Sequence, residues 1–272
     1  MRRQSSLAQF LASAAVTAIM AIGLGGCQTM ADVKGALTSK AEPPPDVDPR
    51  RAAEVYGERY RANPRDAEVA LRYGQALRAT GQRAQAVAVL EQASIAHSTN
   101  KTLLAAYGRA LADNGNFQQA FDVLGRAHTP DNPDWRVLSV QGTALDQLGR
   151  HEEARRYYAS ALQIAPEEPS VLSNLGMSYV LSRELPKAEE TLRRAQATGR
   201  ADARVRQNLA LAIGLQGRFT EAETIVKADL PADEAAANVA YLKQMLSRKD
   251  NPRAAAAARN GKPPVVAFSP AD

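Results

Sequence analysis

The sequence predicts an all-α protein that is built from repeated pairs of helices. Small residues recur at an interval of 34 positions in one register, at Gly74, Gly108, Gly142, Gly176 and Ala210. A second small column keeps this interval, at Ala86, Ala120, Ala154, Ala188 and Ala222. Two apolar columns share it, at Leu77, Leu111, Leu145, Tyr179 and Ile213 and at Leu90, Leu124, Tyr158, Leu192 and Val226. A fixed period of this length is typical of a solenoid in which each unit packs on its neighbours.

Turn glycines divide each unit into two stretches that are long enough for a helix of about three to four turns. They stand at Gly81, Gly115, Gly149 and Gly217. The pattern resembles the tetratricopeptide repeat (TPR), an antiparallel pair of helices. The resemblance covers residues 67–236 as five repeats, which begin at Ala67, Lys101, Trp135, Pro169 and Ala203. It implies a right-handed superhelix of stacked helix pairs, closed by a capping helix at each end.

Three positions depart from the repeat pattern. Gln141 stands at a normally apolar position, Arg183 replaces the turn glycine of the fourth repeat, and Asp229 replaces the last small residue of the fifth. Pro186 still favours a helix start directly after Arg183. We therefore expect the fourth repeat to be retained.

Residues 1–26 have the features of a lipoprotein signal peptide. Arg2 and Arg3 precede an uncharged run over residues 7–24, which matches a basic region followed by an apolar one. The run approaches the roughly 20 residues of a membrane-spanning helix, but it is only weakly apolar and no charged flank follows it. Small residues precede the only cysteine, Cys27, and the run Leu24-Gly25-Gly26-Cys27 resembles the bacterial lipobox.

This resemblance assigns lipid attachment to Cys27, with a buried structural cysteine as the alternative. It implies a diacylglycerol thioether and an acylated amino terminus, with palmitate among the expected acyl chains. One chain holds a protein only marginally, so two or three would give lasting attachment. In lipoproteins of this kind an aspartate after the cysteine favours the inner membrane, whereas this chain has Gln28. The expected location is therefore the periplasmic face of the outer membrane.

The segments around the repeats are expected to be a tether, two caps and a tail. Residues 27–47 contain few large apolar side chains and three consecutive prolines, which predicts a flexible tether. Residues 48–66 form the N-terminal capping helix, because Asp48 can cap it and proline follows. Residues 233–248 form the C-terminal capping helix, and residues 249–272, rich in proline and alanine, form a flexible tail.

Charge and composition argue against several classes of function. The chain has 34 basic and 29 acidic residues, and removal of residues 1–26 leaves a formal balance of +3. That balance is too mild to predict nucleic-acid binding. His97, His128 and His151 lie at unrelated repeat positions, so we expect no metal and no cofactor. The run from His151 lacks the second histidine of HExxH, since Arg155 stands there, and no nucleophile motif occurs; an enzyme is not expected.

In TPR proteins the first helix of each repeat lines an inner groove for protein or peptide partners. The early repeats offer a polar groove, with Arg72, Gln75, Arg78, Arg109, Asp113, Thr143 and Asp146. The later repeats offer apolar residues, Met177, Val180, Leu181, Leu211 and Leu215, beside the amides of Asn174 and Asn208. The amides resemble those that hold a peptide backbone, so the later groove is the expected binding site. The alternative is that its apolar residues pack under the C-terminal cap. Leu71 and Ala105 occupy the lysine positions of the carboxylate clamp, which is therefore absent.

The combination of lipobox, tether, five repeats and tail resembles the TPR lipoproteins of the tight-adherence (Flp) pilus assembly and secretion system. That resemblance implies a pilotin-like role, in which the protein helps the pilus secretin, or a fellow assembly protein, to assemble or localise. The alternative function is a TPR lipoprotein adaptor for peptidoglycan hydrolases or for outer-membrane protein assembly.

Overall fold

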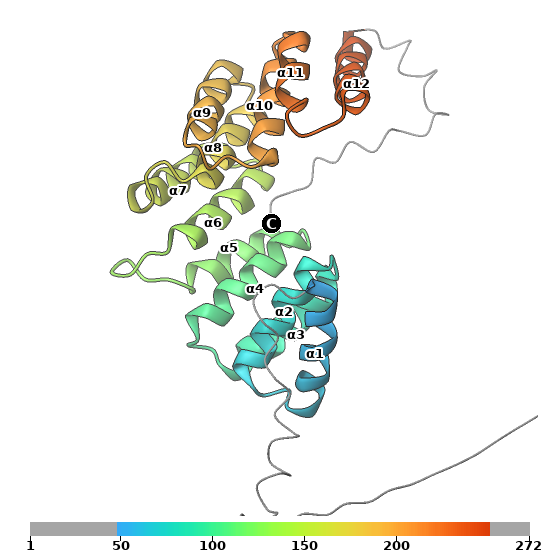
Figure 1. The fold of residues 1–272 in the computed structure, drawn as a ribbon. Coiled ribbons are helices and arrows are strands. Elements are labelled where there is room, and N and C mark those ends of the chain that lie inside the picture. Colours follow the sequence, from blue (N-terminus) through green and yellow to red (C-terminus); the bar gives the residue numbers. More distant parts are fainter. Residues whose placement is uncertain (1–47, 251–272) are drawn as a thin grey trace, which may run out of the picture. The chain divides into compact units, whose positions relative to one another are not determined.

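The computed structural model describes residues 48–250, all of which lie within one compact unit. These described residues form twelve helices and no strand, as the sequence predicts (Figure 1). The helices are α1 (Pro49–Ala62), α2 (Ala67–Ala79), α3 (Arg83–Ala96), α4 (Lys101–Asp113), α5 (Phe117–Gly125), α6 (Trp135–Gln147), α7 (His151–Ile164), α8 (Pro169–Leu181), α9 (Leu185–Ala197), α10 (Ala203–Leu215), α11 (Phe219–Val226) and α12 (Ala232–Asp250). Three expected segments lie outside the described residues: the signal peptide, the tether with Cys27, and the tail, of which only residues 249–250 are described, as the end of α12.

The fold is the expected TPR superhelix of stacked helix pairs. The first helices, α2, α4, α6, α8 and α10, begin at the five residues where the repeats were expected to begin. A polar side chain caps each of these helices by accepting a backbone N–H: Asp66, Asn100, Asp134, Glu168 and Asp202. The second helices, α3, α5, α7, α9 and α11, have no side-chain cap of this kind. Local capping chemistry therefore sets the register of the repeats.

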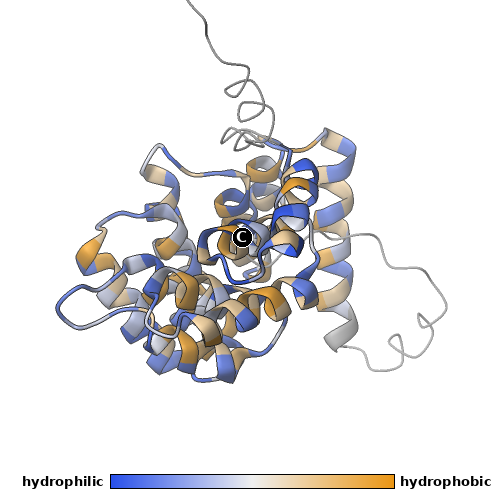
Figure 2. Cartoon of the chain, turned by 90° about the horizontal axis from the view of Figure 1, so that it is seen from below, coloured by the Kyte–Doolittle hydropathy of each residue, from blue (hydrophilic) through white to orange (hydrophobic). Residues whose placement is uncertain are grey.

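The columns of small residues bring the two helices of a repeat into close contact. A Cβ atom placed on Gly142 of α6 would lie 2.6 Å from the ring of Tyr158 in α7. One placed on Gly176 of α8 would lie 2.5 Å from Leu192 in α9. Both large partners are buried. Figure 2 shows that the helices carry hydrophobic residues beside hydrophilic ones, so each buries one part of its surface against its neighbours.

The three departures from the repeat pattern each have a structural explanation. Gln141 is buried, and its side-chain oxygen lies 3.1 Å from Nε2 of His128. Asp229 accepts a hydrogen bond of 2.7 Å from Nε of Arg206. Arg183 keeps the backbone of the glycine that it replaces, with φ of 62° against 84° at Gly217. The repeat geometry is therefore retained, although an arginine must adopt a left-handed backbone.

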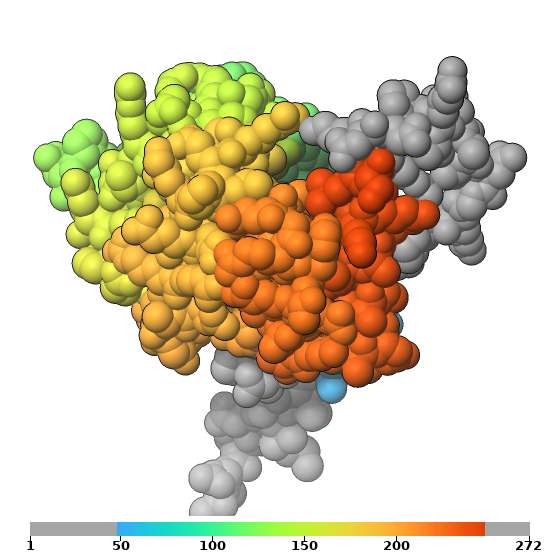
Figure 3. All heavy atoms as spheres, turned by 90° about the horizontal axis from the view of Figure 1, so that it is seen from above, coloured from blue at the N-terminus to red at the C-terminus, as the bar shows by residue number. Residues whose placement is uncertain are grey.

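Capping helices cover both ends of the repeats. At the first end, the rings of Tyr60 in α1 and Tyr73 in α2 lie 5.6 Å apart. At the other end, a Cβ atom on Gly214 of α10 would lie 2.5 Å from Leu242 of α12, and Ala235 of α12 is fully buried. Figure 3 shows α12 (red) beside the orange residues of α10 and α11. No helix within residues 48–250 is long and apolar enough to cross a membrane.

Candidate protein-binding cavity

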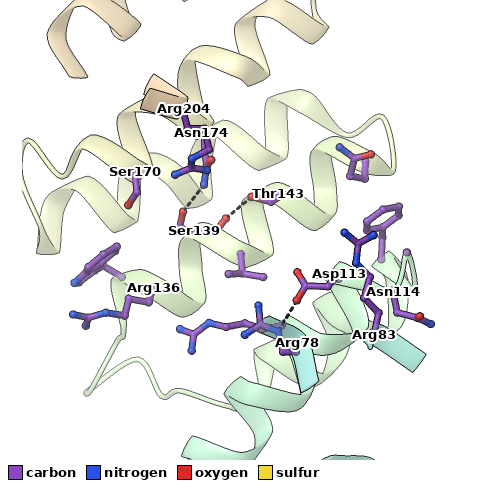
Figure 4. A pocket seen from close by; sticks show the side chains of 17 residues that line it. Arg78, Arg83, Asp113, Asn114, Arg136, Ser139, Thr143, Ser170, Asn174 and Arg204 are labelled. Carbon is purple, nitrogen blue, oxygen red and sulfur yellow. Dashed lines mark hydrogen bonds and ion pairs between the residues drawn. The ribbon is translucent and has the colours of Figure 1, made fainter. Parts of the chain in front are cut away.

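A cavity of about 570 Å³ opens among the first helices of the repeats (Figure 4). We call it the central cavity. Its charged lining residues are Arg78, Arg83, Arg109, Asp113, Arg136 and Arg204. Its larger uncharged lining residues are Phe117, Trp135, Ser139, Val140, Thr143, Gln147, Ser170 and Asn174. The lining comes from all five repeats, and this volume is within the range of roughly 300–1,000 Å³ that ligand sites occupy.

The charge of the central cavity is strongly positive, because five arginines and one aspartate line it. The aspartate is already paired: Nε of Arg78 lies 2.5 Å from Oδ2 of Asp113. Their side chains are only 18% and 20% exposed, so the pair sits within the wall between α2 and α4. The remaining arginines, Arg83, Arg109, Arg136 and Arg204, form no ion pair with any carboxylate of the described residues.

Arg109 in α4 is a partly buried cation. Burial lowers the pKa of its guanidinium, and the neighbouring charges of Arg78 and Arg136 lower it further. Asp134 and Asp113 act in the opposite direction without forming a hydrogen bond to it. A guanidinium stays protonated in proteins, so the lowered pKa signals a positive charge that is poorly compensated.

An aromatic ring lies beside a second cation. The guanidinium carbon of Arg136 lies 4.4 Å from the ring centre of Trp135, which is a cation–π contact. Both residues belong to the first turn of α6, where Asp134 caps the helix. The ring therefore contacts the guanidinium of Arg136, and the N–H groups of this guanidinium remain available for planar acceptors.

Amide and hydroxyl groups complete the wall of the central cavity. Nδ2 of Asn174 in α8 donates a hydrogen bond of 3.1 Å to Oγ of Ser139 in α6. The same relation recurs one repeat later, where Asn208 donates to Ser173 at 2.9 Å. Each bond joins the first helices of adjacent repeats, so these amides stabilise the stacking of the repeats.

The structure brings five of the expected groove residues to the central cavity. They are Arg78, Arg109, Asp113, Thr143 and Asn174. Arg72 and Gln75 are exposed on α2 outside it, and Arg72 pairs with Glu68 of its own helix at 2.7 Å. The polar early groove of the sequence therefore corresponds in part to a basic cavity.

Asp146 differs from its expected place in the groove, because it is buried between repeats. Its Oδ2 accepts a hydrogen bond of 2.9 Å from the hydroxyl of Tyr158, and its Oδ1 accepts one of 2.8 Å from Ser178. Nδ1 of His151 also lies 2.8 Å from Oδ1. With its side chain 4% exposed, Asp146 links α6, α7 and α8 and does not line the cavity. Burial raises the pKa of Tyr158, and the neighbouring carboxylate of Asp146 raises it further.

The later apolar residues do not form one continuous surface. Leu211 and Leu215 line a separate cavity of about 580 Å³ between α10, α11 and α12, which we call the C-terminal cavity. The large side chains of α12 that line it include Tyr241, Leu242 and Met245. The C-terminal helix therefore lies over this part of α10. Four further residues that were expected in the later groove line neither cavity: Met177, Val180, Leu181 and Asn208.

Several residues of the central cavity were missed by the sequence reasoning. Arg136 and Arg204 occupy the second position of the third and fifth repeats, and Ser170 occupies it in the fourth. This position belongs to the inner groove in the TPR pattern. If it is assigned to the groove in every repeat, the sequence identifies all three residues. Trp135 and Arg83 carried no such signal, because they lie at the starts of helices.

The chemistry of the site suits non-covalent recognition. Guanidinium groups donate hydrogen bonds and accept none, and the only carboxylate in the lining is held by Arg78. In the part of the chain that the structure describes, no group of histidine, cysteine and acidic residues is placed to hold a metal ion.

Comparison with protein families identifies tetratricopeptide repeats between residues 108 and 212. Two family profiles described as tetratricopeptide repeat match residues 108–169 and 147–212. A profile described as anaphase-promoting complex, cyclosome, subunit 3 matches residues 50–127. No curated protein sequence matches the chain.

Solved structures share the fold at low sequence identity. The Cut9 and Hcn1 hetero-tetramer of the anaphase-promoting complex matches at 15% identity and a TM-score of 0.61, over 74% of this chain and 40% of that chain. This chain thus spans less than half of that relative. PilW, described as a widely conserved type IV pilus biogenesis factor, matches at 17% identity and a TM-score of 0.61, over 73% of this chain and 91% of that one. PilF of Pseudomonas aeruginosa matches at 18% sequence identity and a TM-score of 0.52, over 74% of this chain and 87% of that chain.

Proposed function

We propose that this chain, a tetratricopeptide repeat protein, is a scaffold for protein partners in the bacterial periplasm. The central cavity is the observation that carries this proposal. It draws its lining from all five repeats and contains charged, amide and aromatic groups. TPR solenoids present such inner surfaces to partner segments.

The proposal extends to a pilotin-like role in Flp pilus assembly, like that of TadD, the TPR lipoprotein of the tight-adherence system. The protein would be held at the outer membrane by acyl chains on Cys27 and would help the pilus secretin to localise. The lipobox-like run before Cys27 and the tether after it support the anchor. The fold similarity to PilF and to PilW, the latter described as a type IV pilus biogenesis factor, motivates the choice of pathway.

Replacement of the acyl acceptor tests the anchored part of the proposal. In cells fed an alkyne-tagged palmitate, the wild type should carry label and fractionate with the outer membrane. Cys27→Ser should carry no label and should lose this fractionation, while Ser39→Ala in the tether should behave as the wild type. A wild type without label that still fractionates with the membrane would contradict a lipid anchor.

Secretin assembly tests the pathway. Deletion of the gene should reduce the amount of assembled secretin in the outer membrane, and the secretin should co-purify with the wild-type protein. If peptidoglycan hydrolases or outer-membrane assembly proteins co-purify instead, and secretin assembly is normal, the protein is an envelope adaptor of another kind.

A further inference from the structure

We propose that the central cavity binds a peptide segment rich in aspartate and glutamate; this inference rests on the scaffold function proposed above. Arg83, Arg109, Arg136 and Arg204 line one cavity, and none forms an ion pair within the described residues. Acidic side chains of a partner are the complement that this lining lacks.

Several arginines of the described residues outside the cavity are paired with acidic residues, although exposed ones such as Arg126 and Arg156 are not. On the second helices and their turns, Arg193 pairs with Glu221 at 2.5 Å, and Arg218 pairs with Glu189 at 2.6 Å. Acidic residues are therefore available to the chain and are used on the outer helices. Unpaired positive charge within a concave wall concentrates its field there, which attracts anionic segments.

The burial of Arg109 gives the proposal its strongest local argument. Its guanidinium has lost part of its hydration without gaining a hydrogen-bonding acceptor from the described residues. A carboxylate that entered the cavity could accept two parallel N–H bonds from this group. Binding would then give the guanidinium the acceptor that it lacks, so Arg109 should contribute more to the affinity than an exposed arginine would.

The arginines are distributed around the cavity. Figure 4 shows Arg204 beside Asn174, whereas Arg83 and Arg136 lie on opposite sides of the view. A single small anion therefore cannot occupy all of these positions, but an extended segment with several acidic side chains can. Phe117 and Val140 also line the cavity and would contact apolar residues between the acidic ones.

The lining favours a peptide over a nucleic acid. One face of the Trp135 ring is covered by Arg136, so that face is not available for stacking on a base. Asn174, Ser139 and Gln147 provide amide and hydroxyl groups that suit a peptide backbone. The formal charge of the whole chain is only +5, whereas a phosphate backbone is bound through extensive basic surfaces.

Fluorescence anisotropy with the full-length protein in detergent tests the inference. The probe is a short labelled peptide in which glutamates alternate with leucines, and the control peptide has glutamines in their place. The glutamate peptide should bind, its affinity should fall with added salt, and the glutamine peptide should bind at least about tenfold more weakly. The double variant Arg109→Gln with Arg136→Gln should weaken the glutamate peptide by at least about tenfold.

A matched double variant controls for the loss of charge. Arg126→Gln with Arg156→Gln removes two exposed arginines that lie outside the central cavity, and it should change the affinity by less than about twofold. Circular dichroism should show both double variants to be folded. Equal binding of the two peptides, or equal loss with both double variants, would overturn the inference. Tighter binding of a single-stranded oligonucleotide of the same charge would overturn it in favour of a nucleic-acid site.

The same peptides and the co-purification of the secretin separate this inference from the proposed function. If the secretin co-purifies with the wild type but the glutamate peptide binds no better than the glutamine peptide, the scaffold function stands and the acidic-segment inference fails. If the glutamate peptide binds as expected but no secretin co-purifies, the cavity chemistry stands and the pilus role fails.

Discussion

The guanidinium of Arg78 in α2 and the carboxylate of Asp113 in α4 form an ion pair of 2.5 Å that joins the first two repeats at the edge of the central cavity. Asp113 is the only acidic residue in the lining of this cavity. The pair therefore has two effects, since it links neighbouring repeats and also lowers the positive charge that a ligand meets.

Asp113→Asn should change stability and binding in opposite directions. Loss of the pair should lower the free energy of unfolding by about 1 kcal/mol, as expected for a partly buried ion pair. The released charge of Arg78 should raise the affinity for the glutamate peptide by about threefold. Urea unfolding and anisotropy measure the two effects. Asp131→Asn, an exposed loop change, should leave both unchanged; weaker peptide binding by Asp113→Asn would show that the carboxylate itself contacts the ligand.

Gly142→Ala should destabilise the central repeat although alanine favours helices. The new Cβ atom would lie 2.6 Å from the ring of the fully buried Tyr158, and such overpacking costs about 1–3 kcal/mol. Because each repeat packs only on its neighbours, thermal unfolding should also become broader. Gly125→Ala is the control, since its Cβ would lie 3.7 Å from Nε2 of Gln141, an ordinary contact distance. Equal melting temperatures for the two variants would show that the helices of this repeat are not tightly apposed.

Arg183→Gly should stabilise the protein by up to about 1 kcal/mol. Arg183 has φ of 62°, and a left-handed backbone costs a non-glycine residue roughly 1–2 kcal/mol. The greater freedom of glycine in the unfolded chain offsets about 0.5–1 kcal/mol of this gain. The converse change, Gly217→Ala at φ of 84°, meets no atom within 4 Å and should destabilise through the backbone alone. Chemical denaturation measures the free energy of unfolding of both variants. A destabilised Arg183→Gly would contradict this explanation of the turn.

Asp146→Ala should lower the free energy of unfolding by at least about 2 kcal/mol. The buried hydroxyl of Ser178 would lose its acceptor, and that of Tyr158 would keep only a long hydrogen bond of 3.4 Å to Oγ1 of Thr143. Each buried polar group left unpaired costs about 1–3 kcal/mol. Asp122→Ala, on the exposed side of α5, should cost less than about 0.5 kcal/mol. Since Asp146 does not line the central cavity, folded Asp146→Ala protein should bind the glutamate peptide normally; a selective loss of binding would place this carboxylate in the site.

The repeat fold could be predicted from the sequence because the signals for it are local. Capping side chains such as Asp66 and Asp134, and turn glycines such as Gly149, act within a few residues of the helix that they delimit. The period of 34 residues then repeats these signals, so that one error of register would have been visible in the other units. Arg183 adopts the same left-handed backbone as the glycines of the other turns.

The binding surface was less predictable because it depends on contacts between distant residues. Asp146 occupies a groove position by sequence, but the hydroxyls of Tyr158 and Ser178 draw it into the interface of repeats. The exposure of Leu211 depends on how α12 packs on α10, and no short-range pattern specifies that packing. The basic character of the cavity appears only when Arg83 and Arg204, from the first and the last repeat, are placed in one lining.

Site-specific photocrosslinking in living cells tests most directly whether partners bind in the central cavity. A photoreactive phenylalanine analogue replaces Gln147, an exposed residue of the cavity lining, or Ser160, an exposed residue of the outer helix α7. We predict a crosslinked adduct at Gln147 that mass spectrometry identifies as the pilus secretin or a fellow assembly protein, crosslinked through an acidic segment, and no adduct at Ser160. An adduct at Ser160 together with none at Gln147 would contradict binding in the central cavity.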